Sequence, residues 1–114
     1  MIPKIQDTII PNNYLQIYNE VSRPVQLRKA ANHNLSPDFT EACIQQLQKR
    51  PYYLVSIAKK YNVKNILEVG TAEGLQFFSF AEYVSGVKGH VWSCDIKDVR
   101  NKDYVSKYVD HTTF

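Results

Sequence analysis

Residues 66–78 read ILEVGTAEGLQFF, and this stretch decides the fold of the 114-residue chain. An apolar run ends in an acid and a glycine, a second glycine follows four positions later, and aromatic residues come next. A glycine directly after a buried strand lets the chain turn sharply and lets a ligand approach the backbone. The stretch therefore predicts a buried strand over 63–69 that turns at Gly70 into a helix over 75–84.

A second apolar run follows a turn rich in glycine and predicts another strand. Residues 90–96 read HVWSCDI, so the order along the chain is strand, helix, strand. A helical crossover of this kind joins parallel neighbours in one sheet. The tail shows a helical pattern over 104–109, and its last residues, HTTF, are compatible with the start of a third strand. We therefore expect an α/β domain with a parallel sheet.

The residues ahead of this unit predict two amphipathic helices and a less regular lead-in. Residues 1–35 are interrupted by three prolines and predict an irregular arm with one short helix near 13–22. Residues 36–114 are assigned to the α/β domain. Within it, helices are predicted near 37–49 and 52–61. Each carries one apolar stripe: Phe39, Cys43, Ile44 and Leu47 in the first, and Leu54, Ile57, Ala58 and Tyr61 in the second. Pro51 should separate them, and Asn62 should cap the second.

Composition and charge exclude several classes of function. The formal net charge is +3 and the basic residues are scattered, which argues against nucleic-acid binding. The two cysteines form no CxxC pair, and no histidine lies at metal-ligand spacing from either. No apolar run approaches the roughly 20 residues of a membrane span, and the first residues lack the apolar core of a secretory leader. These features favour a soluble, cytoplasmic protein.

Two acids lie where a parallel sheet binds its ligands. Glu68 and Asp95 are predicted at the carboxyl ends of the two strands, and open parallel sheets bind ligands outside those ends. The helix that begins near Gly74 points its free N–H groups at the same place. Asp95 also follows Gly74 by about 20 residues, the offset at which an acid meets ribose hydroxyls in nucleotide-binding crossovers.

The spacing of the glycines argues against the two common phosphate-binding loops. Gly70 and Gly74 give GxxxG, not the GxGxxG of dinucleotide sites, and no GxxxxGK[ST] is present. Glu73, inside the loop, would repel a pyrophosphate. A ligand with a ribose and a positive amino or sulfonium group, but no phosphate, fits this acidic loop better.

ILEVGTAEG followed by VWSCDI resembles the first half of a class I S-adenosylmethionine-dependent methyltransferase, closest to the small-molecule O-methyltransferase type. The resemblance implies a Rossmann-like methyltransferase fold and S-adenosyl-L-methionine as cofactor. Six positions match the cofactor-binding residues of the family: Glu68, Gly70, Thr71, Gly74, Asp95 and Ile96. By this match, Glu68 lies near the methionine end, the glycine loop passes under the cofactor, and Asp95 holds the ribose diol, with Ile96 beside the adenine. Ala72 replaces the middle glycine of the commoner motif. The specific part covers about 63–96.

The family has a seven-stranded sheet, whereas this sequence reaches only about the third strand. We therefore expect an incomplete methyltransferase domain that supplies the cofactor-binding half and is inactive alone. The small-molecule substrate and any catalytic base remain unassigned, with His90 and His111 only as guesses. Apolar surface around Phe77, Phe78, Phe80 and Trp92 should be exposed, which predicts a homo-oligomer or pairing with a remainder of the chain. Two alternatives stay open: a non-catalytic interaction module that oligomerises through its exposed sheet edge, and a nicotinamide-dependent oxidoreductase.

Overall fold

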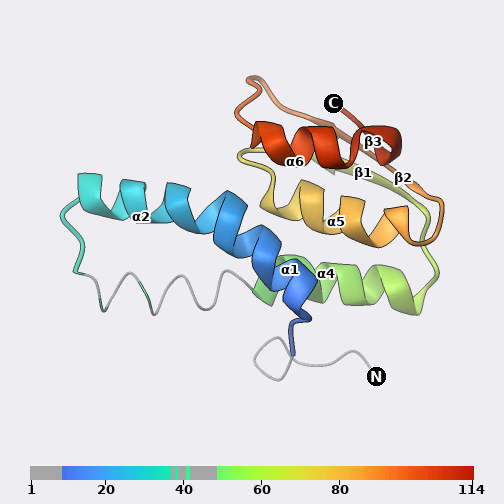
Figure 1. Cartoon of the computed structure of the whole chain (residues 1–114), viewed down its shortest axis with the longest axis horizontal. Helices are drawn as coiled ribbons and strands as arrows, with labels where there is room; N and C mark the ends of the chain where they lie inside the picture. Colours follow the sequence, from blue (N-terminus) through green and yellow to red (C-terminus); the bar gives the residue numbers. More distant parts are fainter. Residues whose placement is uncertain (1–8, 37, 39–40, 42–48) are drawn as a thin grey trace.

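The computed structural model describes residues 9–36, 38, 41 and 49–114. They form an α/β arrangement in which helices lie against a small parallel sheet (Figure 1). The expected fold class, α/β with a parallel sheet, is confirmed at this level. The helix predicted over 37–49 falls almost entirely outside the described residues, and so does its apolar stripe.

The sheet has three parallel strands in the order β1-β2-β3. These are β1 (Asn65–Val69), β2 (His90–Cys94) and β3 (Thr112–Thr113), so both predicted strands and the start of a third are confirmed. The register pairs Glu68 with Ser93 and Leu67 with Trp92. Because side chains alternate along a strand, the first pair faces the helices and the second faces the opposite side.

Helix α5 (Leu75–Ser85) connects β1 to β2 and supplies much of the core. Phe77 and Phe78 are fully buried, so the prediction that they would be exposed is wrong. The reason is α6 (Lys102–Lys107) with the short η3 (Val109–His111) after it, which cover α5 (Figure 1). The rings of Tyr104 and Tyr108 lie 5.4 and 6.2 Å from the Phe78 ring.

The N-terminal residues are helical for longer than predicted. α1 (Asn12–Ile17), the π-helical turn η2 (Tyr18–Ser22) and α2 (Arg23–Asn32) follow one another directly. The helix near 13–22 is confirmed, but an irregular arm is wrong for 12–32. Pro11 precedes the first turn, where a missing N–H costs little. Pro24 is the second residue of α2, directly after the π-helical turn η2. The division of the chain at residue 35 stays a prediction.

Helix α4 (Lys49–Lys60) differs from its prediction at its start and on its buried face. Pro51 lies inside the helix with Lys49 and Arg50 before it, so it does not mark a helix boundary. Val55 and Ala58 are buried, whereas Leu54 is 44% exposed and Tyr61, just after the helix, is 62% exposed. The sequence carries two apolar stripes at helical spacing, and packing against α5 selects the one that contains Val55.

The predicted cap at the end of α4 is confirmed. Asn62 has a φ of +53°. The N–H of Val63 donates to the Ala58 carbonyl (2.9 Å) and that of Asn62 donates to the Lys59 carbonyl (3.2 Å). This pair of bonds is a Schellman motif, and it leads the chain from α4 into β1.

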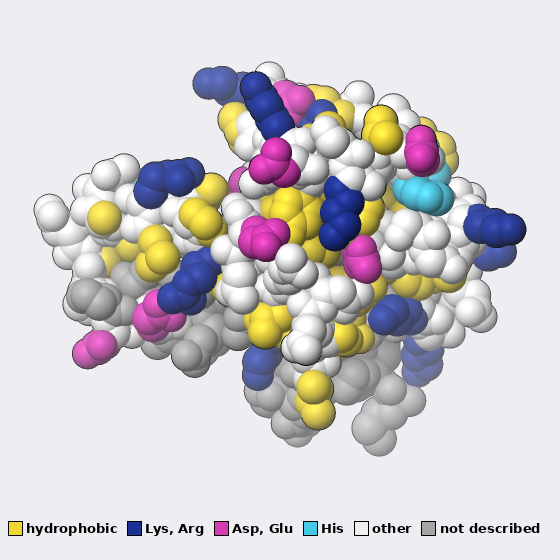
Figure 2. Space-filling view, viewed as in Figure 1, with side chains coloured by type: hydrophobic (Ala, Val, Ile, Leu, Met, Phe, Trp, Pro, Cys, Tyr) yellow, Lys and Arg dark blue, Asp and Glu magenta, His cyan; other side chains and the backbone are white. Residues whose placement is uncertain are grey.

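Within the described residues, one face of the sheet has no helix over it. Leu67, Val69 and Trp92 are 74%, 81% and 42% exposed, so β1 is not the fully buried strand that was predicted. Figure 1 views the molecule from the side on which α5 and α6 cover the sheet. On that side basic side chains are interspersed with acidic ones and form no patch of a single sign (Figure 2).

Candidate functional site

The loop after β1 carries three left-handed backbone positions, at Gly70, Ala72 and Gly74, with φ of +91°, +49° and +106°. At Gly70 a Cβ would meet nothing within 4 Å, so the backbone there faces open space. At Gly74 a Cβ would lie 2.4 Å from the Phe78 ring. The two glycines therefore have different roles: Gly70 leaves room for a ligand, and Gly74 lets the loop pack on α5.

Asp95 connects the end of β2 to this loop. One carboxylate oxygen accepts the N–H of Ala72 (2.8 Å) and the other accepts that of Ile96 (2.7 Å). These backbone donors, that of Ala72 first, lower the pKa of Asp95 below its ordinary value. The side chain is exposed. Because each carboxylate oxygen can accept more than one hydrogen bond, Asp95 retains accepting capacity toward solvent.

Glu68 lies beside Asp95 in a different environment. It is half-buried, and one of its oxygens accepts from the Ser93 hydroxyl (2.8 Å). Burial raises the pKa of Glu68 to about 7; the Ser93 bond opposes this shift and the charge of Asp95 adds to it. Near neutral pH Glu68 is thus close to balance between its two forms, and a neighbouring cation would favour the ionised one.

Thr71 and Ser93 form the buried polar support of Glu68. Their hydroxyls lie 2.5 Å apart, and both residues are about 95% buried, at 4% and 5% exposure. Thr71 therefore serves this cluster instead of facing open space. The strand pattern alone did not single out Ser93. Its signal was register, because Ser93 precedes Asp95 by two positions and pairs with Glu68 once the strands are aligned.

Of the remaining residues near the loop, Ile96 lies at the site, whereas Glu73 and Gly74 contact neighbouring helices. Ile96 is fully exposed directly after Asp95. The Glu73 carboxylate, which was expected to repel a pyrophosphate, accepts from the Ser22 hydroxyl in η2 (3.2 Å). The structure thus gathers five of the six predicted site residues at the exposed end of β1 and β2, while Gly74 packs against Phe78.

The two histidines considered as bases lie away from this edge. His90 begins β2, at the end opposite Asp95, and its ring contacts Trp92 (centroids 4.5 Å apart) and bonds Thr113 (2.8 Å). His111 bonds the carbonyl of Gly89 (3.2 Å) at the same end. Neither is positioned to act on a ligand held by Glu68 and Asp95.

Comparison with known proteins does not identify a family. No protein-family model matches the chain, and neither a curated protein nor a solved structure is significantly similar to it. Within the described ranges, no three His, Cys, Asp or Glu side chains come close enough to hold a metal ion. No helix in the same ranges is long and apolar enough to cross a membrane.

Proposed function

We propose that this chain binds S-adenosyl-L-methionine at the edge formed by Glu68, the glycine loop and Asp95. It would be the cofactor-binding half of a class I methyltransferase of the small-molecule O-methyltransferase type. The observation that carries the proposal is a hydrogen bond between the carboxyl ends of β1 and β2. An exposed carboxylate directly after β2 accepts from the backbone of the loop after β1 (2.8 Å), beside a half-buried carboxylate on β1.

The residues at this edge fit a nucleoside that lacks phosphate. Gly70 faces open space, Asp95 has unused acceptor capacity, and Ile96 offers an exposed apolar side chain. The segment from Asn65 to Leu75 contains no Lys or Arg that could neutralise a phosphate. A carboxylate on each strand end favours a ligand with hydroxyl groups and a positive charge.

Each side chain has a separate task in this proposal. Asp95 would accept from the ribose hydroxyls through the lone pairs that Ala72 and Ile96 leave free. Glu68 would offer negative charge to the positive methionine end, and Ile96 would cover the adenine. The bound cofactor would supply an electrophilic methyl group. The chain's part is to orient the cofactor, since positioning accounts for much of the rate of such a transfer.

Calorimetric titration with S-adenosylmethionine tests the proposal. We expect Asp95→Asn and Glu68→Ala each to weaken binding by about 10- to 100-fold, the usual worth of a hydrogen bond to a charged group. Asp110→Ala, which removes an exposed acid in η3, is the control and should leave the affinity unchanged. An absence of binding by the wild-type chain, or equal affinity in all three variants, would reject the assignment.

The uncovered face of the sheet favours a second candidate, a non-catalytic interaction module. Leu67, Val69 and Trp92 lie exposed on it, beside the outer edge of β1, which pairs with no further strand in the described part of the chain. A thermal-shift panel of S-adenosylmethionine, S-adenosylhomocysteine, NAD and ATP separates the candidates. Stabilisation by the first two supports the methyltransferase, stabilisation by NAD supports an oxidoreductase, and stable oligomers with no ligand effect support the module.

A further inference from the structure

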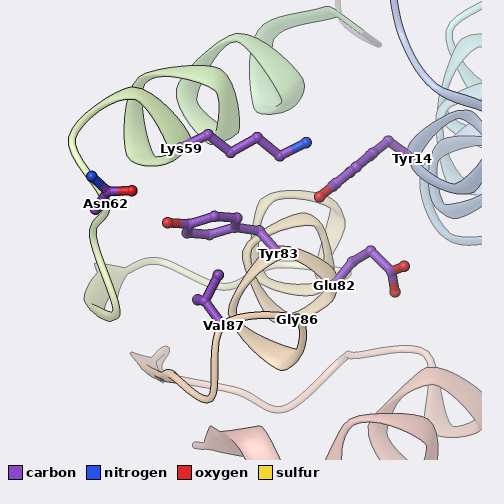
Figure 3. Close-up of a pocket in the computed structure, with 7 residues that line it drawn as sticks. All are labelled: Tyr14, Lys59, Asn62, Glu82, Tyr83, Gly86 and Val87. Carbon is purple, nitrogen blue, oxygen red and sulfur yellow. The ribbon is translucent and has the colours of Figure 1, made fainter.

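A pocket of about 380 Å³ lies at the far end of α5 from the glycine loop. α5 has eleven residues, so the two sites are separated by about 16 Å at 1.5 Å per residue. The ends of α4 and α5 meet α1 around the pocket (Figure 3). Its lining consists of Tyr14, Lys59, Asn62, Glu82, Tyr83, Gly86 and Val87.

Tyr14 brings a hydroxyl to this pocket from a ring that is otherwise buried. The residue is 6% exposed, and its hydroxyl forms no hydrogen bond within the described part of the chain. Figure 3 shows the hydroxyl pointing into the space between Lys59 and Tyr83. Burial, and then the charge of Glu82, raise the pKa of Tyr14, so it stays protonated. The hydroxyl itself is open to solvent, because the Tyr18 hydroxyl is the only fully buried side-chain polar atom without a partner among the described residues. A ligand in the pocket can therefore accept from Tyr14 in place of water.

Lys59 brings a positive charge to the same space. Its Nζ lies 5.1 and 5.2 Å from the ring centroids of Tyr14 and Tyr52. Its Nζ donates to the Tyr52 hydroxyl (3.5 Å), and neither of the ion pairs found among the described residues includes Lys59. An ammonium beside an unused phenol donor is a pairing that suits a negatively charged acceptor.

The acid in the pocket, Glu82, already accepts two hydrogen bonds from other side chains. One oxygen of Glu82 accepts from the Asn13 amide (3.0 Å), and the other accepts from the Tyr108 hydroxyl. Figure 3 shows this carboxylate turned away from Lys59. Its charge is therefore shared with two donors and does not pair with the ammonium.

The rest of the lining combines the Asn62 amide with the apolar surfaces of Tyr83 and Val87. The Tyr83 ring lies under Lys59 (Figure 3), and its hydroxyl is bound to the carbonyls of Ala58 and Val63. Val87 lies next to it. The N–H groups of Gly86 and Val87 donate to carbonyls of α5, so they are not free to bind an anion with several oxygens.

We propose that this pocket binds a small organic carboxylate, held by Lys59 and Tyr14, with its apolar body against Tyr83 and Val87. One cation and one neutral donor suit a single negative charge better than a phosphate dianion. The volume is in the range of small-molecule sites. The inference does not depend on the proposed methyltransferase function, because the two sites share no residue.

Amide NMR titration with benzoate tests the inference, with benzyl alcohol and benzylamine as probes of similar size. Benzoate should shift the amides of Asn62, Gly86 and Val87 with saturation in the millimolar range. Lys59→Met should weaken that binding about tenfold or more, the usual cost of losing a charged hydrogen bond. Tyr14→Phe, which removes only the hydroxyl, should weaken it about threefold to tenfold.

Lys60→Met is the matched control, since Lys60 is the next residue of α4 and its Nζ lies over the Tyr61 ring, outside the pocket. It should bind benzoate as the wild type does. Circular dichroism and the amide spectrum report whether each variant is folded. Absence of saturable shifts at this pocket, equal binding of benzylamine or inorganic phosphate, or equal affinity in Lys59→Met and Lys60→Met would overturn the proposal.

Discussion

Two neighbouring carboxylates at one sheet edge have pKa values displaced in opposite directions. Burial dominates at Glu68 and raises its pKa to about 7, whereas backbone N–H donors dominate at exposed Asp95 and lower its pKa. The structure thus keeps Asp95 charged at neutral pH and leaves Glu68 able to respond to a ligand. Protons compete with a positive ligand for Glu68. Such a ligand should therefore bind more tightly as the pH rises through 7 and Glu68 loses its proton.

Replacement of Glu68 by glutamine should change the pH dependence of stability. A carboxyl with a raised pKa in the folded state contributes stability below its unfolded pKa, and this contribution is lost as the pH rises through about 7. Glu68→Gln keeps an acceptor for Ser93 but cannot ionise. Thermal melts from pH 5 to pH 8 should therefore show a growing advantage of the variant over the wild type. A constant difference across this range would contradict the role of ionisation.

The left-handed backbone at Ala72 predicts a stabilising substitution. Its φ of +49° lies in a region that glycine enters without the penalty of a Cβ. Ala72→Gly should therefore raise the free energy of unfolding by about 0.5–1 kcal/mol, measured by urea denaturation. The same change at Ala81, which is buried within α5, is the control with the opposite sign. There glycine should cost about 1 kcal/mol, and loss of stability at both positions would show that the Ala72 strain is negligible.

At the level of elements, Tyr83 fastens the chain where α4 turns into β1. Its hydroxyl, on α5, bonds the carbonyls of Ala58 (3.2 Å) and Val63 (2.5 Å), on either side of the Asn62 cap. The Ala58 carbonyl also accepts from the Val63 N–H. The Val63 carbonyl therefore depends more on the Tyr83 hydroxyl as its donor than the Ala58 carbonyl does. This contact fixes the approach of the first strand to the crossover helix.

Removal of the Tyr83 hydroxyl should therefore be destabilising. Tyr83→Phe leaves a carbonyl without its donor and should lower the free energy of unfolding by about 1–3 kcal/mol. Tyr61→Phe removes a hydroxyl from a side chain that is 62% exposed and should change stability by less than about 0.5 kcal/mol. Urea titrations of both variants give the comparison, and equal stabilities would mean that water replaces the lost donor.

The elements that the sequence predicted correctly are those fixed by local chemistry. The strands around Gly70, the crossover helix and the Asn62 cap follow from apolar runs and turn residues over short distances. The helical run over 12–32 was underestimated because its prolines were weighted as breakers, although Pro11 precedes the run and Pro24 follows the π-helical turn η2 within it. The buried face of α4 was predicted only in part: Ala58 is buried, but Leu54 and Tyr61 are exposed and Val55 is buried instead. Periodicity cannot choose between two apolar stripes, whereas packing against another element does.

The candidate site, like the elements, was predictable where it depends on local sequence and not where it depends on packing. Glu68 and Asp95 were found because strand ends of a parallel sheet converge whatever the details of packing. The support that Ser93 and Thr71 give to Glu68 could not be predicted without the register between the strands. The burial that raises the pKa of Glu68 depends on how the helices pack on the sheet, which the sequence alone does not show. The pocket at Tyr14 and Lys59 could not be found from sequence, because its lining comes from three helices that only the fold brings together.

At the scale of the whole molecule, the helices that the structure describes cover the sheet on one side only. α5 and α6 bury the side that carries Val91 and Ser93, while Leu67, Val69 and Trp92 on the other side are exposed. A row of large apolar side chains beside an unpaired strand edge is unfavourable in water and promotes association. The expected exposure of apolar side chains was therefore correct for Trp92. The other exposed apolar side chains on this face belong to β1, whereas Phe77 and Phe78 of α5 are buried.

This uncovered face predicts association that a charge on it should prevent. Multi-angle light scattering after gel filtration should give the wild-type chain a mass above that of the monomer. Leu67→Lys and Trp92→Lys, which place an ammonium at 74% and 42% exposed positions, should shift the mass toward the monomer. Ile9→Lys, at a position 89% exposed and outside the sheet, should leave the mass unchanged. Because lysine on an exposed strand opposes edge and face pairing without removing core contacts, loss of association should occur with little loss of helical circular dichroism. A monomeric wild type would contradict the prediction, and so would equal masses in all three variants.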